Sequence, residues 1–103
     1  MSGAWIIPKG YARIAVEGVL DFESVVPLLA QSRSQFAGKE RLDVDLQGVR
    51  RANSAGLALL LEWLDLAHRQ GISLRFRNLP ESLVRLAAVT NVSGLLPVIE
   101  GDA

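Results

Sequence analysis

Hydrophobic and polar residues alternate in three separate segments of the chain, and a period of two is typical of a half-buried β-strand. The three segments are residues 13–18, 41–46 and 72–77. A short strand is also expected over residues 5–7, where it can pair with the first segment through a Lys9-Gly10 turn, and another over residues 95–99. The pattern therefore predicts a small sheet of short strands.

Between the strands, apolar residues recur at the spacing of a helix. The first helix is expected over residues 22–36, with Asp21 available as its N-cap, and Pro27 would kink it unless the proline falls in the first turn. A longer helix is expected over residues 55–70, and a third begins at Pro80. Strands that alternate with helices predict an α/β fold, with helices packed on a small mixed sheet.

The helix expected over residues 55–70 has more apolar residues than a single core-facing stripe needs. On a helical wheel, at ~100° per residue, the stripe expected to face the sheet consists of Leu57, Leu60, Leu61, Leu64 and Ala67. Leu59, Trp63 and Leu66 form a second stripe, more than a quarter turn away. This second stripe is either core, covered by a neighbouring helix, or a partly exposed anchor for a protein partner. We predict a partner surface, since a small domain has few elements with which to cover every side of one helix.

Composition excludes several classes of protein. The chain has 103 residues, which predicts a single domain over residues 1–103. Its 11 basic and 11 acidic residues give a formal net charge of zero, which argues against a nucleic-acid partner. It has no cysteine, which fits a reducing compartment, and its longest apolar run, residues 55–61, is far shorter than the roughly 20 residues of a membrane span. We therefore expect a soluble, cytoplasmic protein that meets a membrane only indirectly.

Candidate catalytic chemistry is sparse. His68 is the only histidine, and without cysteines no metal site or thiol dyad can be assembled around it. Asp43 and Asp45 could mimic a catalytic carboxylate pair, but strand alternation explains them more simply as residues of a solvated face. The sequence also lacks a glycine-rich phosphate-binding loop. We therefore predict a protein that is not an enzyme and holds no cofactor and no metal.

The junction between the strand at residues 41–46 and the long helix is the remaining feature. It reads Val49-Arg50-Arg51-Ala52-Asn53-Ser54-Ala55-Gly56, so either Asn53 or Ser54 should cap the helix. The same position exposes a hydroxyl at the positive end of the helix dipole, where an attached phosphate would be stabilised and would present a new dianion to a partner. Ser54 is thus a candidate cap and a candidate site of phosphorylation or partner contact, and the two roles are compatible.

The order of elements and this junction resemble the STAS domain, the fold of bacterial anti-sigma-factor antagonists. That family carries Asp-Ser/Thr-Ser/Thr/Gly-Gly-Leu at the start of a helix, after a strand that ends in a segment of the Asp-Leu type. This chain has Asp45-Leu46, then Asn53-Ser54-Ala55-Gly56-Leu57, and its Gly18-Val19-Leu20-Asp21 is similar to the family's Gly-Glu-Leu-Asp. The resemblance covers essentially the whole chain and implies a STAS fold, with Ser54 at the position that a partner kinase phosphorylates.

Within this family, the small STAS subunits of the phospholipid ABC transporters of Gram-negative bacteria are the nearer resemblance. It rests on Gly56-Leu57-Ala58-Leu59-Leu60-Leu61 and on Leu64-Asp65-Leu66-Ala67. It implies a non-catalytic cytoplasmic subunit that binds the transporter's ATPase and, through it, the permease, in a system that keeps phospholipid out of the outer leaflet of the outer membrane. The alternative is an anti-sigma-factor antagonist that cycles between free and serine-phosphorylated forms.

The candidate partner-binding residues combine this resemblance with the helical wheel. They are Asn53, Ser54, Ala55, Gly56, Leu59, Trp63 and Leu66. Two of them depart from the family pattern, because Asn53 replaces the Asp and Ala55 replaces the second hydroxyl or glycine. Loss of the carboxylate removes any contact that needs its negative charge and so weakens the case for a kinase-regulated switch, while an asparagine still caps a helix well.

Overall fold

The computed structural model describes residues 3–99, which form a five-stranded sheet and three α-helices. The strands lie in the order β1-β2-β3-β4-β5, with β1 antiparallel to β2 and the other neighbours parallel. The elements are β1 Ala4–Pro8, β2 Arg13–Leu20, α1 Val25–Phe36, β3 Arg41–Ala52, α2 Ser54–Gln70, β4 Ser73–Arg77, α3 Glu81–Val89, the 3-10 turn η1 Ser93–Leu95, and β5 Val98–Ile99. The predicted α/β fold with a small mixed sheet is confirmed.

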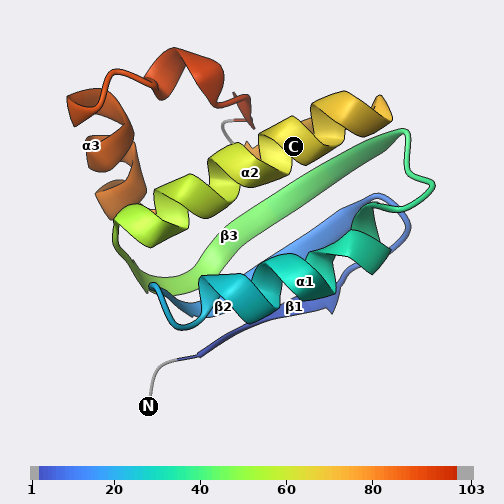
Figure 1. Ribbon diagram of the computed structural model, residues 1–103, viewed down its shortest axis with the longest axis horizontal. Helices are drawn as coiled ribbons and strands as arrows, with labels where there is room; N and C mark the ends of the chain where they lie inside the picture. The colour runs from blue at the N-terminus through green and yellow to red at the C-terminus, as the bar shows by residue number, and fades with distance from the viewer. Residues whose placement is uncertain (1–2, 100–103) are drawn as a thin grey trace.

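Helices α1 and α2 lie on one face of the sheet, and α3 lies beyond the first turns of α2 (Figure 1). The strand side chains that point toward the helices, such as Leu42 and Val44, are fully buried. No helix within residues 3–99 covers the opposite face, which we call the open face. The strand residues that alternate with the buried ones point away from the helices and lie on the open face. They are Arg13, Ala15, Glu17, Arg41, Asp43, Asp45, Ser73, Arg75 and Arg77.

Helix α1 begins three residues later than the sequence pattern predicts. The Oδ1 atom of Asp21 accepts hydrogen bonds from the backbone N–H groups of Glu23 and Ser24, at 3.1 and 3.0 Å, and this turn precedes the helix. Pro27 falls in the first helical turn, where a backbone N–H would have no helical partner, so it causes no kink. The later start leaves Phe22 in the connecting turn instead of in the helix.

Two other boundaries also differ from the prediction. Strand β3 continues to Ala52, beyond the alternating residues 41–46, because the less regular segment that follows still pairs with β2 through two register shifts. The strand expected over residues 95–99 shortens to Val98–Ile99, since η1 occupies the preceding turn. Strand β3 therefore leads directly into the cap of α2.

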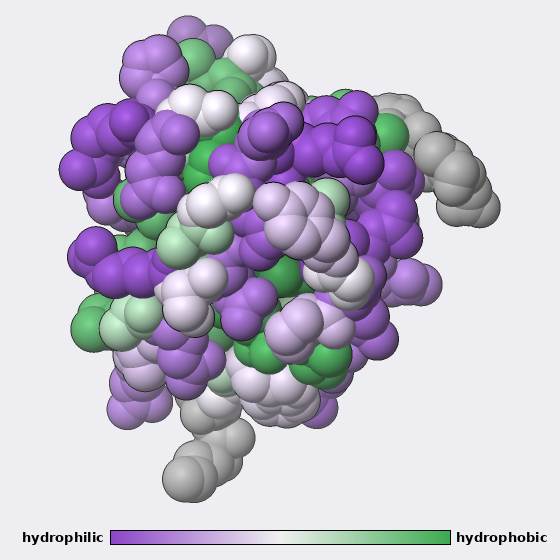
Figure 2. Space-filling model, turned by 90° about the vertical axis from the view of Figure 1, so that its right-hand side faces the viewer, coloured by the Kyte–Doolittle hydropathy of each residue, from purple (hydrophilic) through white to green (hydrophobic). Residues whose placement is uncertain are grey.

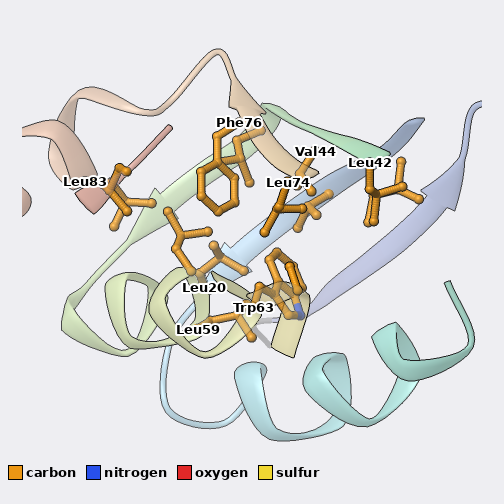
Figure 3. Close-up of a cluster of buried hydrophobic side chains, with 14 of the residues drawn as sticks. Leu20, Leu42, Val44, Leu59, Trp63, Leu74, Phe76 and Leu83 are labelled. Atoms are coloured by element: carbon orange, nitrogen blue, oxygen red, sulfur yellow. The ribbon is translucent and has the colours of Figure 1, made fainter. Parts of the chain in front are cut away.

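The second apolar stripe of α2 is core, so the prediction that it stays partly exposed is wrong. Leu59, Trp63 and Leu66 are 3%, 0% and 8% exposed. Helix α1 packs beside them: the ring centroids of Trp63 and Phe36 are 6.1 Å apart, and the Nε1–H of Trp63 donates to Oγ of Ser32 at 2.9 Å. Figure 3 shows Trp63 pointing from α2 into the cluster of strand side chains. A hydrogen-bond partner inside the core allows this indole to be buried completely.

Candidate functional site

The predicted site lies at one end of the molecule, where β3 runs into α2 and the first turn of α3 lies nearby (left in Figure 1). A groove of about 770 Å³ opens there between the ends of β2 and β3 and the start of α3. Its polar lining includes Asp21, Arg50, Arg51, Asn53 and Glu81. The fold therefore gathers polar side chains from β3, from α3 and from the turns after β2 and β3 around the junction that the sequence singled out.

The cap of α2 is Asn53, which settles one of the two roles considered for Ser54. The Oδ1 atom of Asn53 accepts a hydrogen bond from the N–H of Ala55 at 2.8 Å, so the asparagine performs the capping that an aspartate could perform here. Ser54 is the first residue of the helix and is exposed. Within residues 3–99 its hydroxyl forms no hydrogen bond. Ser54 is thus a free surface group and not the cap.

Ala55 and Gly56, two of the predicted partner-binding residues, pack toward the interior. Both are buried in the first turn of α2. A Cβ added at Gly56 would lie 3.0 Å from the Cβ of Leu20 and 3.2 Å from the Cβ of Ala52. The glycine therefore lets the helix start close to β2 and β3, and in this way it positions Asn53 and Ser54.

An exposed apolar patch beside Ser54 was missed by the sequence analysis. Phe22 and Val26 are each 70% exposed, and we call them the Phe22–Val26 patch. The patch borders a shallow groove of about 160 Å³ between α1 and α2, lined also by Val25, Leu29, Ala55, Ala58, Leu59 and Glu62. Leu59, although almost fully buried, thus forms part of the floor of this groove. Ala55 and Leu59 line this groove and Ser54 immediately precedes Ala55, so three of the predicted residues lie at or beside one surface.

The spacing of the buried residues of α1 carried the signal that could have revealed this patch. Leu28, Ser32 and Phe36 are buried, and they follow one another at intervals of four. Val26 precedes Leu28 by two positions, which is ~200° around a helix and hence on the outer side. Counting Ser32 as a core position would have separated Val26 from the apolar stripe.

Ser54 is not paired with the one histidine of the chain. A serine nucleophile needs a base within hydrogen-bond reach, but His68 lies fourteen positions further along the same helix, at about 21 Å for a rise of 1.5 Å per residue. Among residues 3–99, no group of three or more His, Cys, Asp or Glu side chains could hold a metal ion. Over the same residues, no helix is long and apolar enough to cross a membrane.

The end of the molecule around Ser54 presents an apolar patch with a polar rim, which is the composition of a protein interface.

Comparison with known proteins gives three findings. The family model described as "Mlab, STAS domain" matches residues 8–97. Two curated relatives, from Escherichia coli K12 and Shigella flexneri, are each named intermembrane phospholipid transport system binding protein MlaB; each is 33% identical over 79 residues, which cover 77% of this chain and 79% of the relative. Among solved structures, the unphosphorylated anti-sigma factor antagonist SpoIIAA matches with a TM-score of 0.70 and 10% identity over 92% of this chain and 86% of that chain. The last likeness shows the fold alone.

Proposed function

Because the chain belongs to the STAS-domain family described as MlaB, we propose that it is a non-catalytic subunit of a phospholipid transport system. In this role it binds an MlaF-like ABC transporter ATPase subunit on the cytoplasmic side of the inner membrane and supports the assembly and activity of that ATPase. It meets the permease, and hence the membrane, only through the ATPase, and it contributes to outer-membrane lipid asymmetry. The observation that carries the proposal is the 33% identity to two phospholipid transport binding proteins over 77% of the chain.

The Phe22–Val26 patch and Ser54 form the proposed docking surface. Aromatic and aliphatic side chains at the centre of an interface supply most of its binding energy, while polar groups form the rim. Phe22 and Val26 are the exposed apolar centre, Glu62 and the neighbouring Ser54 supply the polar rim, and the groove floored by Leu59 can receive a side chain of the ATPase. The proposed role of this surface requires binding alone.

Co-expression with the ATPase and permease of a phospholipid ABC transporter tests this proposal. We expect the three proteins to purify together and the ATPase to hydrolyse ATP more slowly when this subunit is left out. Val26→Asp should break the complex, because it places a charge in the apolar centre. The matched control is Val89→Asp, since Val89 is also a largely exposed valine but lies on α3, away from the patch. Equal loss of the complex in both variants, or copurification that neither affects, would contradict the assignment of the surface.

An anti-sigma-factor antagonist remains the alternative, and one observation favours it. The Ser54 hydroxyl is exposed at the start of a 17-residue helix, where the helix dipole stabilises an added phosphate. This function predicts that a serine kinase acting on sigma-factor regulators phosphorylates Ser54 and that Ser54→Ala abolishes the labelling. Mass spectrometry of the chain after incubation with such a kinase separates the two functions, because the transporter subunit requires no modification.

A further inference from the structure

Three exposed arginines lie together on the open face, near the starts of three adjacent strands. Arg13 of β2 lies opposite Asp43 of β3, and Asp43 lies opposite Arg75 of β4. With strands ~4.8 Å apart, the Cα atoms of Arg13 and Arg75 are about 10 Å from each other. Arg41 precedes Asp43 by two residues and therefore lies on the same face, about 7 Å along β3. We call Arg13, Arg41 and Arg75 the arginine triangle.

The acidic residues of this region are already engaged within the sheet. Asp43 is only 8% exposed. Its Oδ1 accepts from Nε of Arg75 at 3.2 Å and its Oδ2 accepts from Nε of Arg77 at 3.4 Å. Asp45 accepts from Nδ2 of Asn78 at 2.8 Å. Glu17, further along β2 on the same face, accepts from Nε1 of Trp5 at 3.2 Å. Four guanidinium groups thus share the open face with three carboxylates, and this gives a local positive excess of one on a chain whose net charge is zero.

The arginine triangle keeps most of its hydrogen-bond donors free. The side chain of Arg75 is 48% exposed, and its contact with Asp43 uses Nε, so both terminal amino groups remain for another acceptor. Arg13 and Arg41 are exposed and form no ion pair or hydrogen bond through their side chains within residues 3–99. The planar guanidinium group donates two parallel N–H groups and matches the geometry of a carboxylate.

We propose that the arginine triangle is a second interaction surface, which binds an acidic segment of a partner protein. The charge complementarity favours carboxylates, and Asp43 holds one of the three guanidinium groups in a fixed orientation. Each basic residue near an anionic membrane contributes only ~1 kcal/mol to binding, so this small excess of charge would not hold the protein on lipid by itself.

Figure 2 looks onto the end of the molecule where β2 and β3 begin, and hydrophilic residues cover much of that end. The open face lies across the sheet from α1, so a protein bound at the Phe22–Val26 patch leaves it accessible (Figure 1).

Fluorescence anisotropy with a labelled 12-residue peptide of alternating Asp and Glu tests this proposal on the full chain. The double variant Arg13→Glu/Arg41→Glu should bind at least about tenfold more weakly, because like charges then face each other across the interface. The neutral variant Arg13→Gln/Arg41→Gln should show a smaller loss of the same sign. Raising the salt concentration from 50 mM to 0.5 M should also weaken binding, because the Debye length falls to about 4 Å.

The matched control is Arg69→Glu/Arg85→Glu, which changes the net charge equally but places the reversal on exposed residues of α2 and α3. It should bind the peptide within about twofold of the parent. If the control loses as much affinity as the test variant, the interaction is nonspecific and the proposal is wrong. The proposal is also wrong if the folded parent does not bind the peptide. It is wrong as well if the parent binds vesicles with 30% phosphatidylglycerol instead of the peptide and the Arg13→Glu/Arg41→Glu variant loses that vesicle binding.

Discussion

The inner side of α2 and the surface at its first turn belong to one helix, yet they differ in exposure. The inner side, formed by Leu59, Trp63 and Leu66, is buried and joins α1 to the sheet. The surface at the first turn, Ser54 with the Phe22–Val26 patch, is exposed. The two regions differ in whether α1 covers them, because this helix begins only at Val25 and leaves the outer side of its own first turn open.

This difference shows that a surplus of apolar residues on one helix is not sufficient evidence for an interface. In this domain one neighbouring helix, α1, covers the second apolar stripe of α2. Ser32, a buried serine of α1, accepts the hydrogen bond of the Trp63 indole N–H. Apolar side chains that remain exposed after such packing are the better indication of a partner. Four predictions test whether stability resides in the first region and binding in the second.

Trp63→Ala should have the largest effect, and the effect should be on folding. Removal of a buried Trp side chain costs about 3–5 kcal/mol, which is a large fraction of the stability of a domain of this size. The control is Trp5→Ala: Trp5 is 48% exposed on the edge strand, and its removal should cost about 1 kcal/mol or less. Chemical denaturation of both variants measures the difference. Equal midpoints would mean that Trp63 is not part of the core.

Trp63 also illustrates how far the sequence could predict this molecule. Alternation and helical spacing identified the strands, the three helices and the mixed sheet, because each of these patterns reflects burial on one side of a single element. A helical wheel, however, describes one helix about its own axis and carries no information on its neighbour. The contact between Ser32 and Trp63 joins residues 31 positions apart, and no periodicity within either helix specifies it.

The candidate site was predictable to the same extent. Its location followed from the strand–helix junction and from the resemblance, and Ser54 is exposed there. The Phe22–Val26 patch depended on the position at which α1 begins, which the hydrogen bonds of Asp21 decide. Gly56 was assigned to the surface because a motif residue can act by close packing as well as by contact, and only its distances to Leu20 and Ala52 reveal the packing.

Ser32→Ala should have the second largest effect on stability. It removes the acceptor of the Trp63 Nε1–H and leaves a buried donor without a partner, which costs about 1–3 kcal/mol. Ser34→Ala, on the exposed side of the same helix, is the control and should change stability by less than about 0.5 kcal/mol. Thermal melts compare them, and a blue-shifted or quenched Trp63 emission reports the altered contact. A neutral Ser32→Ala would show that the hydrogen bond contributes nothing.

Asn53→Ala should cost about 1 kcal/mol, because it removes the cap of α2. Asn53→Asp keeps an acceptor oxygen and adds a favourable charge at the helix N-terminus, so it should retain or raise the stability. The two variants together separate capping from charge, and equilibrium denaturation measures each. If Asn53→Ala leaves stability unchanged while Ser54→Ala lowers it, the cap has been assigned to the wrong residue.

Ser54 should have the smallest effect on folding and, in the second region, a large effect on binding. Ser54→Ala removes an exposed hydroxyl without a hydrogen bond, so stability should change by less than about 0.5 kcal/mol and the complex with the ATPase should persist.

Ser54→Arg places a cation at the positive end of the helix and a bulky side chain beside the Phe22–Val26 patch. It should therefore abolish the complex, while the free energy of unfolding falls by at most ~1 kcal/mol. Ser54→Glu separates the two effects, because its charge favours the helix start and any loss of binding must then arise at the interface. Melting temperatures and copurification with the ATPase, measured on the same preparations, give both quantities. Wild-type affinity in Ser54→Arg would place the docking surface elsewhere on the molecule.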